Sequence, residues 1–375
     1  MRKKSLLKTL FYSLILFSIL ECTSKEKEHI ELWDASLISD IDLPYKNINA
    51  IDLNEIPFDN LSDYGFFQGL IRNLDPVEGV LLYEPASSLF TDYAFKSRFI
   101  WLPKGNSITI QNDVEGTFDF PDNTILIKNF YYPVDFSQPE GIRRILETRL
   151  LVKQRGTWEA YPYIWKDDQS DAQYKVAGAE IKVHWKDYNG DQVMINYLVP
   201  NKNQCKSCHN IHEQLVPIGV KAKYLNHTIV HKEESENQLL KWAISGKLSN
   251  YSKEKRYPSM VNYQDTSQPL ELRARAYLDI NCAHCHRAEA PGSTSGLFLT
   301  YEEMDPMKLG ILKTPVAAGF GAGSFKFDIV PGKSDQSILT YRMGTNLVGA
   351  AMPELGRVSV HQEGLELIKK WIDEM

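Results

Sequence analysis

The sequence predicts a multidomain protein in which an N-terminal all-β region is followed by mainly α-helical segments. Between residues 79 and 200, aromatic and β-branched runs are separated by Gly, Pro, Asn and Asp, a pattern typical of an antiparallel sheet or sandwich. After residue 200, apolar residues recur at helical spacing instead. A chain of 375 residues is long enough for more than one domain.

The N-terminus has the features of an export signal over residues 1–21. Basic residues precede an apolar run from Leu10 to Leu20, which is shorter than the about 20 residues that a membrane-spanning helix needs. An uncleaved anchor helix is the alternative. Cys22 follows the run directly and resembles the lipidation site of bacterial lipoproteins, although it could also be a spare cysteine. Residues 22–78 are predicted to hold a polar tether and a segment without assigned structure.

A β-hairpin is the clearest element of the β domain, which is predicted to span residues 79–200. Apolar and polar residues alternate over residues 181–185 and 192–197, on either side of an Asn-Gly pair. Asn189-Gly190 supplies the positive φ angles that a tight turn requires. Further strands are predicted at residues 99–102, 124–127 and 150–152.

Helical patterns follow the β domain. The predicted units are residues 201–250, a polar linker over 251–268, and a last unit over 269–375. In the first unit, apolar residues 239–243 predict a helix that ends near Gly246. In the last unit, Leu272, Ala276 and Ile280 recur every four residues, and residues 365–372 predict a terminal helix.

Two short cysteine motifs carry the chemistry. They are Cys205-Lys-Ser-Cys208-His209 and Cys282-Ala-His-Cys285-His286. Residues three apart share one face of a helical turn, so both thiols of a motif can form thioethers with the vinyl groups of one haem. The histidine that follows is placed to bind the iron as an axial ligand. The motifs therefore predict two covalently attached haems c. They also predict that the helical units are cytochrome c-type haem domains.

Zinc is the alternative cofactor at the first motif, because His212 follows closely and could join Cys205, Cys208 and His209. The ligand pairs of zinc fingers are usually separated by a longer segment, which favours haem. Disulfides are a further use for cysteines in an exported chain, but the paired spacing favours haem attachment over them. His284, inside the second motif, is expected to be a spacer whose ring points away from the iron.

The sixth ligand of each iron decides whether a haem carries electrons or reacts with substrate. For the second haem, Met352 is the leading candidate and Met343 its rival, and core packing is the alternative role for either side chain. For the first haem no methionine lies close in sequence. The candidates there are Met194, Met260, His212, His227 and His231, and an open position is also possible.

The last unit is similar to cytochrome c domains in which a Pro-Gly loop precedes the methionine ligand. The matching residues are 331–339, Arg342, Met352-Pro353 and Trp371-Ile372. This resemblance supports Met352 over Met343.

Nearly the whole chain after about residue 73 resembles a family of bacterial dihaem c-type cytochromes with an N-terminal β region. The segments that carry this resemblance are residues 89–94, 99–103, 149–152, 203–209, 273–278 and 352–357. It implies haem content and architecture without giving a substrate. Residues 120–130 show a weaker similarity to cytochrome P460, in which a β-sheet domain ends in one haem motif and the haem is crosslinked to the protein. Lys128 is the nominal counterpart of that crosslink.

Three functions fit these features. The first is an electron carrier in the bacterial cell envelope with two six-coordinate haems. The second is a haem enzyme, peroxidase-like or P460-like, with an open site at haem 1 and haem 2 as relay. The third is a β module that recognises a partner or a sugar and uses the haems as a relay.

The charge and the leader indicate the partners and the location. The formal net charge is −6, and loss of the basic leader makes the mature chain more acidic, which argues against nucleic acid as a partner. We expect redox proteins of the envelope as partners, and membrane attachment through a lipid on Cys22. The expected location is the periplasmic side of the cell envelope.

Overall fold

The computed structural model describes residues 33–375 except 43, 45 and 232–233. Residues Asp34–Met375 form one compact unit. The predicted export signal and Cys22 lie outside the described residues. The predicted boundaries between the β domain and the following segments remain predictions.

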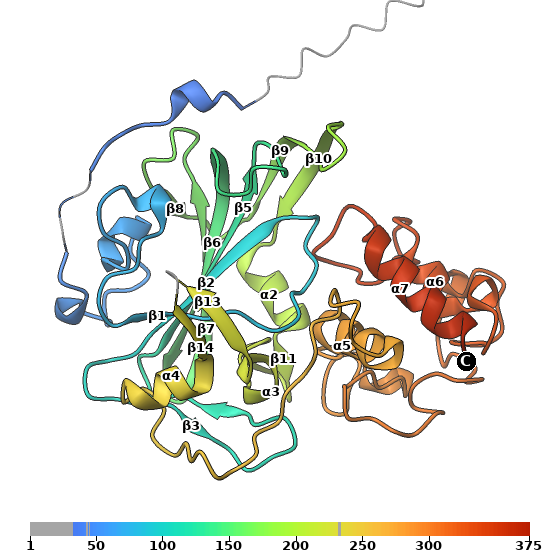
Figure 1. Ribbon diagram of the computed structural model, residues 1–375. Coiled ribbons are helices and arrows are strands. Elements are labelled where there is room, and N and C mark those ends of the chain that lie inside the picture. Colours follow the sequence, from blue (N-terminus) through green and yellow to red (C-terminus); the bar gives the residue numbers. More distant parts are fainter. Residues whose placement is uncertain (1–32, 43, 45, 232–233) are drawn as a thin grey trace, which may run out of the picture. The chain divides into compact units, whose positions relative to one another are not determined.

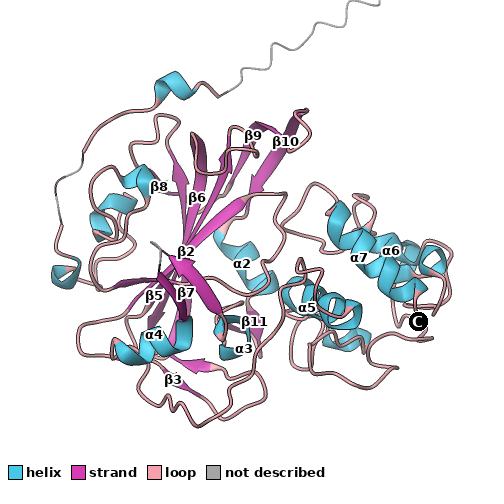
Figure 2. Cartoon of the chain, in the orientation of Figure 1, coloured by secondary structure: helices cyan, strands magenta, loops and turns pink. Residues whose placement is uncertain are grey.

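A six-stranded antiparallel sheet occupies the region predicted as β, with the strand order β1-β2-β5-β6-β7-β8 (Figures 1 and 2). Its strands are β1 Val80–Leu82, β2 Phe95–Trp101, β5 Ile125–Pro133, β6 Arg143–Gln154, β7 Thr157–Trp165 and β8 Ala172–Tyr174. The register of β5 against β6 shifts between Phe130 and Tyr131, which marks a β-bulge. The longest strands, β5, β6 and β7, lie inside the sheet, and β5 and β7 are rich in the β-branched and aromatic residues that favour strands.

Four two-stranded units complete the strands of the described chain. They pair β3 Thr109–Ile110 with β4 Phe118–Asp119, β9 Ala179–Lys186 with β10 Gln192–Val199, β11 Asn210–Ile211 with β12 Gln214–Leu215, and β13 Thr228–His231 with β14 Glu234–Asn237. The hairpin predicted around Asn189-Gly190 is confirmed, and Gly190 has the positive φ of 90° that the turn requires. It forms a sheet of its own instead of extending the six-stranded one.

The prediction of mainly α-helical cytochrome c-type haem domains is wrong. In the described chain the α-helices are α2 Lys202–Cys208, α3 Ala222–Leu225, α4 Gln238–Ile244, α5 Leu270–Cys282, α6 Ile338–Met343 and α7 Gln362–Asp373. Only α5 and α7 exceed three turns, with 13 and 12 residues. Much of the chain between α5 and α6 is turns and loop, because Pro and Gly recur there and interrupt helical hydrogen bonding.

Short 3-10 helices occur in the two loop-rich parts of the chain. They are Ala35–Leu37, Ile48–Ala50, Leu61–Tyr64, Ile71–Asn73, Ser293–Ser295, Gly319–Ala322 and Ser334–Gln336. The first four lie in the segment before β1, which had no predicted structure, and three of these contribute buried aromatic or aliphatic side chains to the core.

The two faces of the six-stranded sheet are covered by different parts of the chain. One face packs against the segment before β1, where the Tyr64 and Tyr163 hydroxyls lie 2.9 Å apart. On the other face, Ile100 and Leu126 join a core that continues into α4, α5 and α7. The side chains that alternate along β2, β5 and β6 therefore face either this N-terminal cover or the segments with the cysteine motifs.

The contact between α5 and α7 supplies a test of this packing. A Cβ at Gly364 of α7 would lie 2.3 Å from the buried Tyr277 ring of α5. Gly364→Ala should lower the free energy of unfolding by about 1–3 kcal/mol through overpacking, although alanine favours a helix. Urea unfolding checks this, with the exposed Glu366→Ala as control. A more stable G364A variant would contradict the close packing.

Candidate haem-attachment site

The first motif lies on α2, which begins with a reciprocal cap. The Asn201 side chain accepts a hydrogen bond from the backbone N–H of Gln204, and the Gln204 side chain accepts one from the N–H of Asn201. Cys205 and Cys208 lie one turn apart on this helix. His209 ends it, and its N–H donates to the Cys205 carbonyl at 2.9 Å. The motif is thus a single helical turn with the imidazole directly after it.

The His209 ring is oriented by the chain that returns through β11 and β12. Its Nδ1 lies 2.8 Å from the Val216 carbonyl oxygen. A carbonyl can only accept, so Nδ1 carries the hydrogen and Nε2 keeps its lone pair. Burial lowers the pKa of His209 to about 3, which favours the neutral ring that binds a metal. Histidines that bind a metal through one ring nitrogen usually donate a hydrogen bond from the other in this way.

The second motif follows the same design at the end of α5. The N–H groups of Cys285 and His286 both donate to the Cys282 carbonyl. Ser295 donates its hydroxyl hydrogen to Gly292 at 2.7 Å, so it accepts from His286 Nδ1 at 3.4 Å. Nε2 of His286 is again the nitrogen with a free lone pair. Burial lowers the pKa of His286 to about 4.

The fold brings the two motifs together. The Sγ atoms of Cys208 and Cys285 and a ring nitrogen of His284 lie within 4.8 Å of one another. Cys285 Sγ also lies 3.7 Å from the Ser207 carbonyl oxygen. The thiols of both motifs are free, with no disulfide in the described chain. Two groups attached at these motifs would be neighbours.

A pocket of about 30 Å³ lies between the motifs. Its lining includes Cys208, Val216, Tyr224, Ala283 and His284. This volume suits about one water molecule and is far below the roughly 300 Å³ or more of a cofactor pocket. The thiols and imidazoles are the groups that haem attachment needs, but this pocket has no room for a haem. The surrounding segments would have to separate for a haem to enter.

The structure gives less support to zinc at the first motif, because His212, the additional ligand predicted for it, lies apart from the sulfur–imidazole cluster. The His212 side chain is 67% exposed and pairs with Glu289 at 3.6 Å. His212 does not join the sulfur–imidazole cluster among the described residues, where His284 lies instead. His284, expected to be a spacer, has a buried Nδ1 without a hydrogen-bond partner in the described chain.

The loop that carries Met352 is held by Arg357. The guanidinium donates to the carbonyl oxygens of Met352 at 3.0 Å and Thr345 at 2.8 Å. The charge of Arg357 also acts on the Cys282 thiol, which places this loop beside the second motif. Met352 is half-buried, whereas Met343 on α6 is buried in the core that α5 and α7 share. These surroundings suit Met352 as a ligand and Met343 as a packing residue.

The candidates for the sixth ligand of the first haem have other surroundings. Met194 on β10 is 47% exposed, and Met260 is buried in the core. The His227 ring nitrogens contact the Thr228 and Glu84 carbonyl oxygens at 3.1 and 2.8 Å. His231 lies in β13, and its side chain is outside the described atoms. Among the described side chains, no hydrogen bond joins these candidates to the first motif.

A buried charge cluster that sequence reasoning missed lies beside both motifs. The Lys223 ammonium on α3 is 1% exposed and pairs with Glu115, Asp279 and Glu302 at 2.8, 2.7 and 3.3 Å. Asp279 is on α5, one turn before Cys282. Burial alone lowers the pKa of Lys223, but these carboxylates raise it above its ordinary value. No local pattern predicts the cluster, because its members come from distant parts of the sequence.

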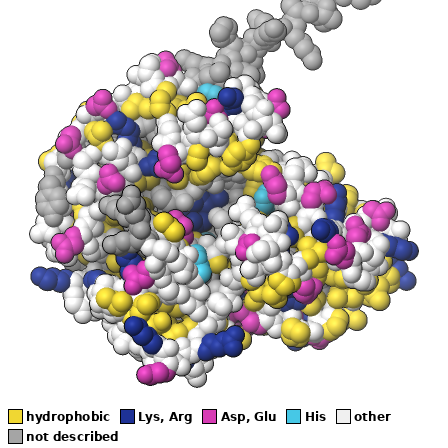
Figure 3. All heavy atoms as spheres, in the orientation of Figure 1, with side chains coloured by type: hydrophobic (Ala, Val, Ile, Leu, Met, Phe, Trp, Pro, Cys, Tyr) yellow, Lys and Arg dark blue, Asp and Glu magenta, His cyan; other side chains and the backbone are white. Residues whose placement is uncertain are grey.

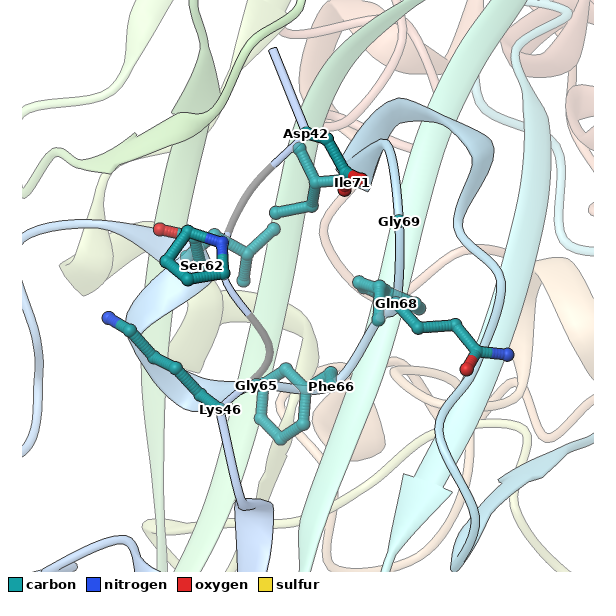
Figure 4. Close-up of a pocket in the computed structure, with 11 residues that line it drawn as sticks. Asp42, Lys46, Ser62, Gly65, Phe66, Gln68, Gly69 and Ile71 are labelled. Carbon is teal, nitrogen blue, oxygen red and sulfur yellow. The ribbon is translucent and has the colours of Figure 1, made fainter.

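A second pocket lies away from the motifs, beside the 3-10 helix Leu61–Tyr64 (Figure 4). It encloses about 210 Å³, and its labelled lining residues are Asp42, Lys46, Ser62, Gly65, Phe66, Gln68, Gly69 and Ile71. It brings together no cysteine or histidine, so the cysteine motifs are the chemical site with the stronger support.

Comparisons with models of protein families, with curated proteins and with solved structures found no match for this chain. None of the helices in the described part of the chain combines the length and the apolar composition needed to cross a membrane.

The buried charge cluster gives a stability prediction. Lys223→Met leaves two buried carboxylates, Glu115 and Asp279, without the cation that they share, so we expect a loss of about 3–5 kcal/mol in the free energy of unfolding. Lys369→Met removes an exposed pair with Glu366 and should cost less than about 1 kcal/mol. Urea unfolding of both variants is the measurement. Equal, small effects would show that the cluster does not support the fold.

Proposed function

We propose that this protein is a dihaem c-type cytochrome that transfers electrons in the bacterial cell envelope. One observation carries the proposal: both cysteine motifs place two free thiols and an imidazole with an available Nε2 within a single turn. Covalent attachment of haem c needs this set of groups.

Each residue has a defined part in this proposal. Cys205 and Cys208 would hold the first haem, and Cys282 and Cys285 the second. His209 and His286 would bind iron through Nε2, held in orientation by Val216 and Ser295. Met352 would fill the sixth position of the second haem. Haem iron supplies a centre that accepts and releases a single electron.

Electron transfer is favoured because the two motifs are neighbours. The cluster of Cys208, His284 and Cys285 joins the first motif to the second. A thioether sulfur opposite histidine raises the reduction potential of the iron and leaves no position for substrate. The protein would then pass an electron between two adjacent haems and on to an envelope partner.

The proposed location rests on the sequence of the leader. We propose export, lipid attachment at Cys22 and redox proteins of the cell envelope as partners. Membership of the dihaem cytochrome family with an N-terminal β region and the similarity to cytochrome P460 also remain predictions.

A haem enzyme is the second candidate function. It is favoured because the basic side chains of Lys128 and Arg149 lie near His209. Carbon monoxide separates the two candidates. Binding by the reduced wild-type protein would support an open iron, whereas its absence at both haems would contradict the enzyme.

Haem attachment is tested by mass. Mature protein from a host with cytochrome c maturation should carry two haems, and Cys205→Ala with Cys208→Ala should carry one, because thioether bonds are lost at one motif only. Intact-mass spectrometry and the pyridine haemochrome spectrum measure this. Met343→Leu is the control and should keep both haems. Wild-type protein with the mass of bare polypeptide would overturn the proposal.

The sixth ligand of the second haem is tested by substitution. Met352→Ala should lower the reduction potential of one haem and let it bind carbon monoxide, since a thioether ligand is removed. Redox titration and the spectrum with the gas are the measurements. Met343→Leu should leave both unchanged because Met343 is a core residue. The reverse pattern would assign the ligand to Met343.

A further inference from the structure

Four basic side chains lie on the sheet face that is turned toward the cysteine motifs. Arg98 on β2 lies directly opposite Lys128 on β5, and Lys128 lies opposite Arg149 on β6. Lys96 is two residues before Arg98 and so points to the same face. The row beside them, Ile100, Leu126 and Leu151, packs into the core shared with the helices. We call Lys96, Arg98, Lys128 and Arg149 the cationic face.

One carboxylate pairs with the cationic face in the described chain. Glu147 is fully buried and accepts two hydrogen bonds from Arg149, at 2.8 and 2.5 Å. The Tyr197 hydroxyl also donates to Glu147, at 2.7 Å. The Glu147 carboxylate therefore already accepts hydrogen bonds from Arg149 and Tyr197.

The remaining cations of this face have neutral partners. Lys96 donates to the Ala94 carbonyl at 2.7 Å, and Arg98 donates to the Ser88 hydroxyl at 3.2 Å. The Lys128 ammonium lies 4.9 Å from the centre of the Phe130 ring. Burial lowers the pKa values of Lys96, Arg98 and Lys128. None of the three has a carboxylate within 4 Å among the described residues.

Two further carboxylates act on this face, the buried Asp92 and the exposed Glu84, whose charge acts on Arg98. Asp92 is already engaged. It accepts hydrogen bonds from the backbone N–H groups of Val358 and Ser359 and from the Ser359 hydroxyl, all at 2.7–3.0 Å. Its charge acts on Lys96 from a distance. The cationic face therefore keeps an excess of positive charge.

The cations around Lys223 are compensated differently. In the cluster around Lys223, the basic residues Lys221, Lys223 and Arg287 meet three carboxylates. Like charges placed opposite each other across strands destabilise a sheet, and a buried charge without a partner costs several kcal/mol. Arg98 is buried, and Lys128 and Arg149 are partly buried, so an anion bound on this row would stabilise it.

The cationic face lies beside the first motif. The charges of Lys128 and Arg149 act on His209, and that of Arg149 acts on Cys205 and Cys208. Helix α2 and strand β12 both pack on β7, the neighbour of β6. In Figure 3, Lys and Arg side chains are visible in the recessed centre of the face shown.

We propose that the cationic face is an anion-binding site beside the first cysteine motif, and that it takes a carboxylate or a small oxyanion. The guanidinium group of Arg98 can bind such planar, two-oxygen groups through paired N–H donors. In Arg149, Nε and Nη2 already donate to Glu147, which leaves the donors of Nη1 for the anion. Lys128 supplies a point charge between them. Two sources share this chemistry: the propionates of the first haem, which rests on the proposed function, and a soluble anion such as nitrite.

Lys128→Met tests the site, with Lys186→Met as the matched control. Lys186 is a strand lysine that pairs with Asp135 outside this face. Lys96→Met is the second variant if K128M fails to fold. Haem content, the reduction potentials of the haem-loaded protein and calorimetric titration with nitrite are measured on the same samples.

The two sources give different results. For propionates, K128M lowers the potential of the first haem, K186M does not, and nitrite binds neither protein. For a soluble oxyanion, nitrite binds wild type and K186M, and K128M weakens its binding at least tenfold.

Failure of this inference is separate from failure of the proposed function. With two haems present, unchanged potentials and no nitrite binding in any variant would overturn the anion site alone. Absence of haem would overturn the cytochrome, while the nitrite titration would still decide whether the face binds a soluble anion.

Discussion

A buried ammonium group holds the two motif-bearing parts of this protein together. Lys223 extends from α3, just after the first motif, and contacts carboxylates from the β3–β4 connection, from α5 and from the loop after the second motif. Breaking a buried ion pair is costly, so this arrangement resists separation. Asp279 also accepts hydrogen bonds from the Tyr224 hydroxyl and the Tyr301 backbone N–H, which fixes α5 one turn before Cys282. The cluster therefore links the parts of the chain that carry the two motifs.

The distribution of buried charge divides the interior into two regions. Around Lys223 each cation has a carboxylate, as structural ion pairs require. On the cationic face, Glu147 pairs with Arg149, and the other three cations have no carboxylate within 4 Å among the described residues. Perturbed, incompletely paired groups are typical of functional sites. The balanced cluster thus has a structural role, and the unbalanced face has the character of a binding surface.

The electron-carrier and enzyme proposals differ at the first motif only. At the second motif, Arg357 holds the Met352 loop beside Cys282, as a fixed thioether ligand would need. At the first motif, His209 is positioned by Val216, whereas the sheet presents basic side chains and no methionine. The two motifs are neighbours, but the residues that surround the first differ from those that surround the second.

The sequence alone determined the local features: the cysteine and histidine spacing within one turn, the Asn-Gly hairpin and the strands of the β region. These depend on residues a few positions apart, whose geometry the backbone sets. The tertiary structure decided the short helices after residue 200, the contact of Cys208 with Cys285, and the row of Arg98, Lys128 and Arg149. Such features arise from strand register and long-range packing, which bring together residues whose separation in sequence carries no signal.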